Sequence, residues 1–169
     1  MTDDLLVRAA GSADLRDLHL MVERAYRGDS ARRGWTHEAD LLTGPRIAFA
    51  SLEAMVADIR QRLLVAERSN AIIGCVALIP QEEGLVYLGL LCVDPEAQAG
   101  GVGKAIIAAA EDAAITMGAN RIEMTVISLR RELIAYYERR GFRRTGEKRP
   151  FPVELGPRLE MVVLEKPVG

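Results

Sequence analysis

Along the first part of the chain, apolar and polar residues change from a strand-like spacing to a helical one. Residues 5–9 are spaced as a short strand. Ser12 is then placed to cap a helix over residues 13–27, where apolar side chains recur every three or four positions. Ser51 is placed to cap a second helix that ends near Arg62. This part of the chain therefore predicts one strand followed by two helices.

The middle of the chain carries longer apolar runs, of the kind found in buried strands. Residues 63–69 and 70–80 predict two strands joined at a turn of Ser69 and Asn70. Residues 84–93 are nearly continuously apolar, which is typical of a strand covered on both faces. We therefore expect a hairpin followed by a central strand.

A helical spacing returns after the central strand. The helix that it predicts has one apolar face, formed by Val102, Ile106, Ala109, Ala113 and Met117. A strand over residues 121–127 follows, and then a helix over residues 131–140 that is closed by Gly141. The last two strands are expected within residues 142–147 and 159–165.

The order of the expected elements is β-α-α-β-β-β-α-β-α-β-β. Strands interleaved with helices in this way form a sheet layered by helices. The fold class is therefore α/β (α+β), with a mixed central β-sheet and helices on both faces. Because domains commonly span roughly 100–200 residues, we expect one domain over residues 1–169.

Composition and charge exclude several classes of protein. Hydrophobic residues make up 49% and charged residues 27% of the chain, a balance typical of a globular protein. The net charge of -2 gives no broad basic face, so we expect neither a nucleic acid nor a membrane as partner. Residues 1–11 start with acidic residues and have no long apolar run. They predict no signal peptide and a cytoplasmic location.

The cysteines and histidines offer no metal chemistry. Cys75 and Cys92 stand in apolar surroundings, which favours two reduced core thiols over a disulfide framework. His19 and His37 are the only histidines, and no group of Cys, His or carboxylates has the spacing of metal ligands. We therefore expect no metal.

Three glycines, Gly100, Gly101 and Gly103, crowd the start of the predicted third helix, and Lys104 follows them. The first N–H groups of a helix have no partner within it, and the helix dipole adds positive charge there. Residues without a Cβ would let an anion approach these groups closely. The spacing alone leaves two interpretations open, an anion cradle and a tight turn.

The spacing excludes two kinds of phosphate-binding loop. A Walker loop would need glycine at Gln98 and a hydroxyl residue at Ala105, and a dinucleotide fingerprint would need glycine at Ile106. The pattern that fits is Q-x-x-G-x-G, formed by Gln98, Ala99, Gly100, Gly101, Val102 and Gly103.

This segment resembles the GNAT family of acyl-CoA-dependent N-acetyltransferases. A second segment, AYYERRGF at residues 135–142, is similar to the family's tyrosine-x-x-x-glycine-phenylalanine ending. The resemblance covers residues 63–147, and residues 1–30 by the order of strand and helix. It implies a loop whose amides bind the coenzyme A pyrophosphate, with acetyl-CoA as co-substrate. The binding residues that it implies are Leu91, Cys92, Val93, Gln98, Ala99, Gly100, Gly101, Val102, Gly103 and Lys104.

The resemblance also implies the chemistry. An amine attacks the thioester carbonyl, the backbone of Cys92 and Val93 pairs with the pantetheine arm, and Tyr137, four residues before Gly141, protonates the leaving thiolate. Core packing is the alternative role for all three side chains. Arg130 stands where the family often has asparagine. It is either a phosphate or substrate contact or a solvated residue at a helix start.

The base and the acceptor stay open. Glu38, Asp40 and His37 in the polar stretch 28–45 are candidates for removing the amine proton, as is water; the remaining alternative is an amine that arrives neutral. We expect the primary amine of a small molecule as acceptor. A protein or peptide amine is the alternative, and so is a catalytically silent acyl-CoA sensor on the same fold. A homodimer is compatible with the sequence.

Overall fold

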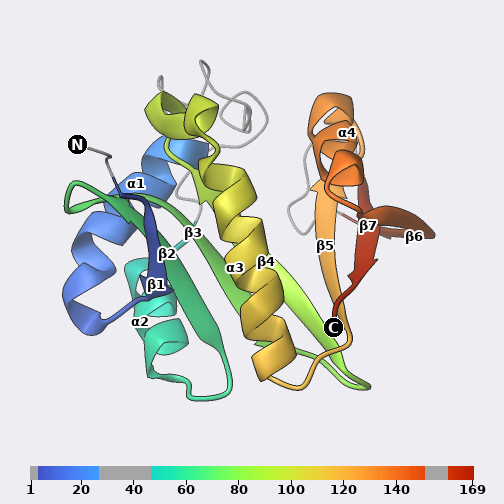
Figure 1. Ribbon diagram of the computed structural model, residues 1–169, viewed down its shortest axis with the longest axis horizontal. Helices are drawn as coiled ribbons and strands as arrows, with labels where there is room; N and C mark the ends of the chain where they lie inside the picture. The colour runs from blue at the N-terminus through green and yellow to red at the C-terminus, as the bar shows by residue number, and fades with distance from the viewer. Residues whose placement is uncertain (1–3, 27–46, 151–159) are drawn as a thin grey trace.

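The computed structural model describes residues 4–26, 47–150 and 160–169, and within these ranges seven strands form one sheet (Figure 1). The strand order across the sheet is β1-β2-β3-β4-β5-β7-β6. β4 and β5 run parallel, and the other neighbouring strands run antiparallel. The strands are β1 (Leu6–Ala9), β2 (Arg62–Arg68), β3 (Ala71–Pro80), β4 (Leu85–Val93), β5 (Arg121–Ile127), β6 (Arg143–Pro150) and β7 (Glu160–Pro167).

The helices of the described residues lie between these strands in the predicted order. The α-helices are α1 (Leu15–Tyr26), α2 (Phe49–Ala57), α3 (Val102–Thr116) and α4 (Arg131–Arg139). Two short 3₁₀ helices, η1 (Ser12–Asp14) and η4 (Pro95–Gly100), precede α1 and α3. The prediction of a mixed sheet with interleaved helices is confirmed.

Two apolar clusters show which helices cover which face of the sheet. One cluster joins α3 and α4 to inward-facing residues of β2, β3, β4, β5 and β7. The other joins α1 and α2 to the oppositely directed residues of β2, β3 and β4. Figure 1 shows α3 lying across the near face of the sheet. Helices therefore cover both faces, as predicted.

The buried side of α3 differs in part from the predicted stripe. Val102 and Ile106 are fully buried, as expected. The row then continues in steps of four to Ala110 and Ala114, with Ile107 beside it. The predicted residues Ala109, Ala113 and Met117 lie at the edge of the cluster, partly buried. The reason is that α3 packs along its i±4 ridge, so the contact line does not shift by one residue after Ile106.

Both predicted serine caps were wrong. Gly11 is the cap residue of η1, and its N–H donates to the Asp14 carboxylate over 2.7 Å, while Ser12 is the first residue of η1. α2 begins after Ala48, so Ser51 lies within its first turn. The same helix ends at Ala57 rather than near residue 62. It ends there because Asp58 has extended backbone angles and accepts the N–H of Arg60 in a turn.

Two predicted turns are confirmed. Ser69 and Asn70 have φ values of 51° and 64°, and two consecutive positive values are the signature of a tight two-residue hairpin turn. Gly141 has φ of 97° directly after α4, a conformation that favours glycine, so it ends that helix as expected.

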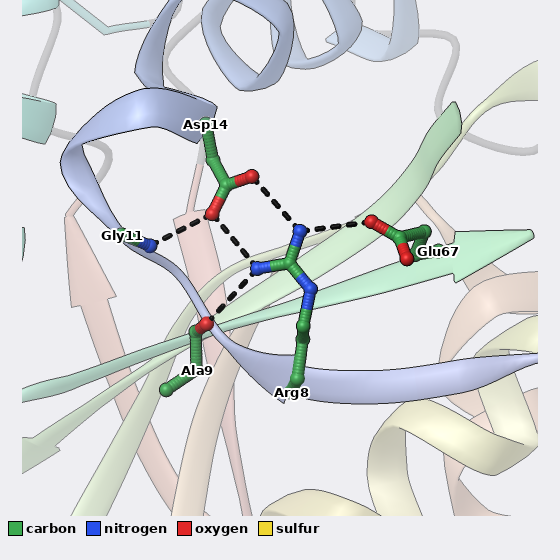
Figure 2. Close-up of polar contacts among 5 residues, drawn as sticks. All are labelled: Arg8, Ala9, Gly11, Asp14 and Glu67. Atoms are coloured by element: carbon green, nitrogen blue, oxygen red, sulfur yellow. Dashed lines mark hydrogen bonds and ion pairs between the residues drawn. The ribbon is translucent and has the colours of Figure 1, made fainter. Parts of the chain in front are cut away.

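An ion-pair cluster ties the N-terminal strand to its neighbours, and we call it the Arg8 cluster (Figure 2). Arg8 donates to both carboxylate oxygens of Asp14, over 2.8 and 2.9 Å, and to Glu67 over 2.8 Å. The Arg8 hydrogen bonds lower the pKa of Asp14 to about 2, and the two carboxylates raise the pKa of Arg8. β1, η1 and β2 are thus held together by a two-oxygen pair of the strong, charge-assisted kind.

Candidate functional site

A bulge changes the direction of the side chains near the end of β4. Between the β3–β4 pairs Cys75–Cys92 and Ala77–Gly89, β4 has one residue more than β3, and Leu90 has φ of 54°. Val86 and Leu88 therefore belong to the cluster under α3, whereas Leu90 belongs to the cluster under α1. Bulges of this kind re-aim side chains and the strand end.

β4 and β5 diverge beyond a short common segment. Their parallel ladder holds three residue pairs, Leu85–Arg121, Val86–Ile122 and Tyr87–Glu123. Figure 1 shows the two strands separating from this segment toward the edge of the sheet where η4 and α4 lie. We call the diverging strand ends, residues 88–93 and 124–127, the fork.

The segment 100–103, which we call the glycine loop, runs from the last residue of η4 to the second residue of α3. Asp94 accepts the N–H of Glu96 and so caps η4, and it also pairs with Arg24 of α1 over 3.0 Å. Gly101 is the N-cap of α3 with φ of 74°, and a Cβ there would meet nothing within 4 Å. Glycine at 101 is therefore required by the backbone turn and not by lack of space.

A Cβ at Gly103 would meet a neighbouring side chain too closely, and a Cβ at Gly100 would make a tight contact. A Cβ on Gly103 would lie 2.7 Å from the hydroxyl oxygen of Tyr136, a distance that such contacts do not reach. A Cβ on Gly100 would lie 3.2 Å from Nη1 of Arg68. A phenol from α4 and a guanidinium from β2 thus lie directly against the loop. The tight turn that the sequence left as one interpretation is present at Gly101, and the anion cradle stays a prediction.

Two arginines near the glycine loop have a buried nitrogen without a hydrogen-bond partner. Among the described residues, three buried side-chain atoms lack a partner, and two of them are Nε of Arg68 and Nε of Arg140. The Arg140 guanidinium lies 4.3 Å from the centre of the Tyr136 ring, whose hydroxyl reaches Gly103. A phenol and two guanidinium groups therefore surround the start of α3.

Lys166 of β7 fixes the end of α4 relative to α3. Its ammonium donates to the backbone oxygen of Arg140 over 2.7 Å and pairs with Glu111 of α3 over 2.6 Å. The same side chain lies against Gly141, where a Cβ would come within 3.0 Å of Lys166 Cε. The position of the Arg140 main chain is thus set from two elements.

Tyr137 lies inside the apolar cluster under α3 and α4. It is 7% exposed, and its ring meets those of Tyr136 and Phe142 edge to face, with centres 5.4 and 5.9 Å apart. Its neighbour Tyr136 is only partly buried and reaches the glycine loop. The two adjacent tyrosines therefore point to different places, one into the cluster and one to Gly103.

The other predicted coenzyme residues lie along one path. Leu91 and Val93 pack against the cluster under α3, and Val93 Cγ2 lies 3.9 Å from the Cβ position of Gly103. Cys92 points to the opposite face. Val102 is buried and Lys104 is exposed. Gln98 and Ala99 belong to η4. The end of β4 thus leads through η4 into the glycine loop.

The two cysteines are free and buried, as predicted. They are directly opposite each other on β3 and β4, and their sulfur atoms are 3.7 Å apart. Arg130 is the cap residue of α4. The candidate bases His37, Glu38 and Asp40 lie outside the described residues.

A buried carboxylate that the sequence analysis missed lies at the base of the fork. Glu123 is 7% exposed and accepts from Arg149 of β6 over 2.9 Å, and hydrogen bonds to Glu147 and Glu123 raise the pKa of Arg149. Beside it, the hydroxyls of Tyr87 and Thr125 share a hydrogen bond of 2.7 Å across the two strands. In the sequence, Glu123 occupies a polar position of the alternation in residues 121–127, as Arg121 and Thr125 do, so the pattern alone gave no signal of its burial.

The described residues were compared with what a metal site or a membrane-spanning helix requires. No group of three or more His, Cys, Asp or Glu side chains within those ranges is arranged to hold a metal ion. None of the helices described there has the length and apolar character needed to span a bilayer.

Comparison with known sequences shows what kind of protein carries this arrangement. Residues 38–152 match the acetyltransferase (GNAT) domain family. The chain is also 31% identical over 108 residues to an IAA acetyltransferase of Azospirillum brasilense, a match that spans 63% of this chain and 68% of that protein.

Solved structures have the same fold. The ribosomal-protein-S18-alanine N-acetyltransferase of Escherichia coli is similar with a TM-score of 0.77 and 16% identity, over 98% of this chain and 95% of that chain. The Salmonella typhimurium protein yncA, solved with its cofactor acetyl-CoA, has a TM-score of 0.76 and 17% identity, over 98% of this chain and 95% of that chain. At these identities the similarity concerns the fold alone.

Proposed function

Because the chain belongs to the GNAT acetyltransferase family and is therefore an acyltransferase, we propose that it transfers the acetyl group of acetyl-CoA to the primary amine of a small molecule. The observation that carries the proposal is the glycine loop at the start of α3, which follows β4 and η4 and lies beside the fork. A protein solved with acetyl-CoA has the same fold.

The residues present fit the coenzyme. The N–H groups of the first turn of α3 have no partner within the helix, and together with the helix dipole they attract an anion. Two arginines with a buried nitrogen without a partner are nearby, Arg68 beside Gly100 and Arg140 on the ring of Tyr136, whose hydroxyl lies against Gly103. The residues that would hold the diphosphate are Gln98, Ala99, Gly100, Gly101, Val102, Gly103 and Lys104.

The strand end and α4 would hold the rest of the coenzyme. The backbone of Leu91, Cys92 and Val93 would bind the pantetheine arm at the fork as an added strand binds a sheet edge. Acetyl-CoA supplies the acetyl group as a thioester, which is reactive toward amines. Tyr137 would hold the proton that the departing sulfur needs. Its position four residues before Gly141 and its apolar surroundings support this role, since they restrict water and fix the ring.

Glu123 would receive the proton of the acceptor amine. Arg149 bonds Oε1 of this carboxylate, and Oε2 is the oxygen that would accept from the amine. The carboxylate lies at the last pair of the β4–β5 ladder, where the fork begins, next to the hydroxyls of Tyr87 and Thr125. Because Glu123 is only 7% exposed, a small or extended amine would reach it more easily than a bulky one. This favours a small-molecule acceptor.

Release of free thiol from acetyl-CoA over a panel of amines tests the proposed reaction. The panel should contain small primary amines, amino acids, and short peptides with a free N-terminus. The peptides are included because a protein with the same fold acetylates a ribosomal protein, as its name states. We expect release with a small primary amine. Release with peptides alone would favour the protein-amine alternative. Acetyl-CoA binding without release across the panel would favour a silent sensor.

Glu123→Gln tests the acceptor side. It keeps the shape and can still accept from Arg149, so we expect unchanged acetyl-CoA affinity and a fall in kcat of roughly 10²-fold, in the range for a lost general base. Glu165→Gln is the matched control, because Glu165 is the register partner of Glu123 on β7. If Glu123→Gln lowers the melting temperature but keeps kcat, the residue serves only to hold β6.

A further inference from the structure

We propose that Arg68 and Arg140 bind the phosphate groups of the coenzyme, one from each side of the glycine loop, and that they set its affinity. The proposal rests on the proposed function, because it concerns the same coenzyme. It adds two side chains, from β2 and from the end of α4, that the loop pattern of residues 98–103 does not include.

Arg68 reaches the loop from the β2–β3 hairpin. It is the last residue of β2, directly before the tight turn of Ser69 and Asn70. Its Nη1 lies 3.2 Å, and its Nη2 3.8 Å, from the position of a Cβ on Gly100. Any side chain at position 100 would therefore push the guanidinium away. The missing side chain of Gly100 admits Arg68 to the loop.

Arg140 reaches the loop from α4 across Tyr136. Its guanidinium lies on the face of the Tyr136 ring, and the hydroxyl of that ring lies against Gly103. The Arg140 backbone is held by Lys166, which donates to its carbonyl oxygen. The guanidinium is therefore placed by a fixed main chain and a flat aromatic support, an arrangement in which arginine loses little freedom on binding.

The unpartnered nitrogens indicate a ligand. A buried donor without an acceptor is costly, and such groups are rare in folded proteins. Here one lies beside Gly100, and the other belongs to the guanidinium on the ring of Tyr136, whose hydroxyl lies against Gly103 near the positive N-terminus of α3. Two acids on neighbouring elements are already engaged, since Asp94 pairs with Arg24 and Glu111 pairs with Lys166. An anion from outside the chain satisfies both arginines.

Phosphate groups fit this arrangement. A guanidinium donates to phosphate oxygens in a planar fork, and its bonds to an ionised acceptor are stronger than neutral ones. Coenzyme A offers two sources of the same chemistry, the diphosphate and the 3′-phosphate. The proposal covers both, and the choice of ligand in the experiment separates them.

Calorimetric titration with coenzyme A and with 3′-dephospho-coenzyme A is the test. The variants are Arg68→Gln and Arg140→Gln. The matched controls are Arg62→Gln and Arg139→Gln, which remove exposed arginines from the same strand and the same helix. We expect each test variant to lose roughly 10- to 100-fold in affinity for coenzyme A, the range for one charge-assisted contact, and each control to lose less than about 3-fold.

The two ligands assign each arginine to a phosphate. A loss with coenzyme A that disappears with the dephospho form supports contact with the 3′-phosphate, and an equal loss with both supports contact with the diphosphate. A loss no larger than in the controls overturns the assignment for that arginine. Wild-type protein that binds neither ligand would overturn the proposed function itself, which keeps the two failures distinct.

The melting temperature of the ligand-free variants separates binding from structure. Because Nε of each arginine has no partner to lose, we expect the melting temperature of both variants to stay close to that of the wild type. A lowered melting temperature with unchanged coenzyme affinity would overturn the proposal. Where a glutamine variant does not fold, Arg68→Lys or Arg140→Lys decides. Lysine binds phosphate as a point charge without the planar fork, so a partial loss of affinity is expected and full affinity would contradict the proposal.

Discussion

The Arg8 cluster and the surroundings of the glycine loop use arginine in opposite ways. Arg8 has carboxylates on two sides, Asp14 and Glu67, and its partners come from the chain itself. Arg68 lies against the glycine loop, which carries no acid, Arg140 lies on the ring of Tyr136, and each keeps a buried nitrogen without a partner. One group of charges is complete in the folded chain, and the other is not.

The difference teaches how to separate residues that hold the fold from residues that serve binding. A satisfied ion pair contributes to stability, and its loss should be visible in unfolding measurements alone. Unsatisfied buried donors lower stability, by about 1–3 kcal/mol each, and gain their partners on binding. Burial and charge do not distinguish the two groups, because arginines occur in both. The state of their hydrogen bonds does.

The largest expected effect is on turnover, and it concerns the surroundings of the glycine loop rather than the Arg8 cluster. Tyr137→Phe keeps the ring and its contacts with Tyr136 and Phe142, so coenzyme affinity and melting temperature should change little. Turnover should fall roughly 10²- to 10⁴-fold, because phenylalanine has no proton to give. Steady-state rates with an acceptor from the panel measure this.

Tyr136→Phe is the control for that variant. Its hydroxyl lies at Gly103 and not inside the cluster, so it should affect coenzyme affinity more than turnover. A Tyr137→Phe enzyme with normal turnover would mean that Tyr137 only packs.

The next effect is on coenzyme affinity. Gly103→Val places a branched side chain where a single Cβ would already lie 2.7 Å from the Tyr136 hydroxyl, so the phenol and Arg140 behind it must move. We expect affinity for acetyl-CoA to fall by about 100-fold or more. A 100-fold loss corresponds to about 2.8 kcal/mol of binding free energy, which is the loss of about two hydrogen bonds to the coenzyme. Calorimetric titration measures the loss.

Gly101→Ala sharpens the same point. Its Cβ would meet nothing within 4 Å, so the cost is the φ of 74° alone, about 1 kcal/mol of unfolding free energy. Coenzyme affinity should fall much less than in Gly103→Val. Equal losses of affinity in both variants would contradict the distinction between space and turn.

A smaller effect is expected at the Arg8 cluster, and there it should appear in stability. Asp14→Ala removes both oxygens that Arg8 uses and the acceptor of the Gly11 N–H. We expect a loss of about 1–2 kcal/mol in unfolding free energy, which for a domain of this size is a fall of roughly 2–8 °C in melting temperature. Urea unfolding measures it. A change in the coenzyme affinity of Asp14→Ala would contradict the view that the Arg8 cluster serves only the stability of the fold.

The smallest effect is a pH dependence of the same pair. The folded-state pKa of Asp14 is lowered to about 2 from an ordinary value near ~3.9. The stabilisation is therefore fully present above about pH 4 and is lost as the pH falls toward 2. Solvent screens this partly exposed pair, so we expect about 1 kcal/mol. Urea midpoints at pH 5 and pH 3 should differ more for the wild type than for Asp14→Asn.

Local patterns in the sequence predicted the order of elements, the Ser69–Asn70 turn and the glycine loop. These features depend on residues close in sequence, such as the two positive φ values of the turn or the helix start after Gly101. The serine caps failed because the helices begin earlier, after Gly11 and Ala48, which places Ser12 and Ser51 inside the first turns. Such a shift in the helix start is not visible in a pattern.

The groups that complete the site could not be predicted, because they come from distant parts of the chain. In the sequence, β3 and β4 separate Arg68 from Gly100. Most of α3 and the whole of β5 separate Gly103 from Tyr136 in α4. Glu123 is buried only because β6 brings Arg149 to it. The contacts exist through the sheet order, in which β7 lies between β5 and β6.

In mechanical terms, the short β4–β5 ladder makes the sheet two plates joined along a seam of three residue pairs. β1 to β4 form one plate, and β5, β7 and β6 form the other. The Lys166–Glu111 ion pair connects the second plate to α3. Bending about so short a hinge moves the far ends of the plates most. A molecule bound between the two plates would restrict this bending. Amide hydrogen exchange in β5 should therefore slow when coenzyme A is added.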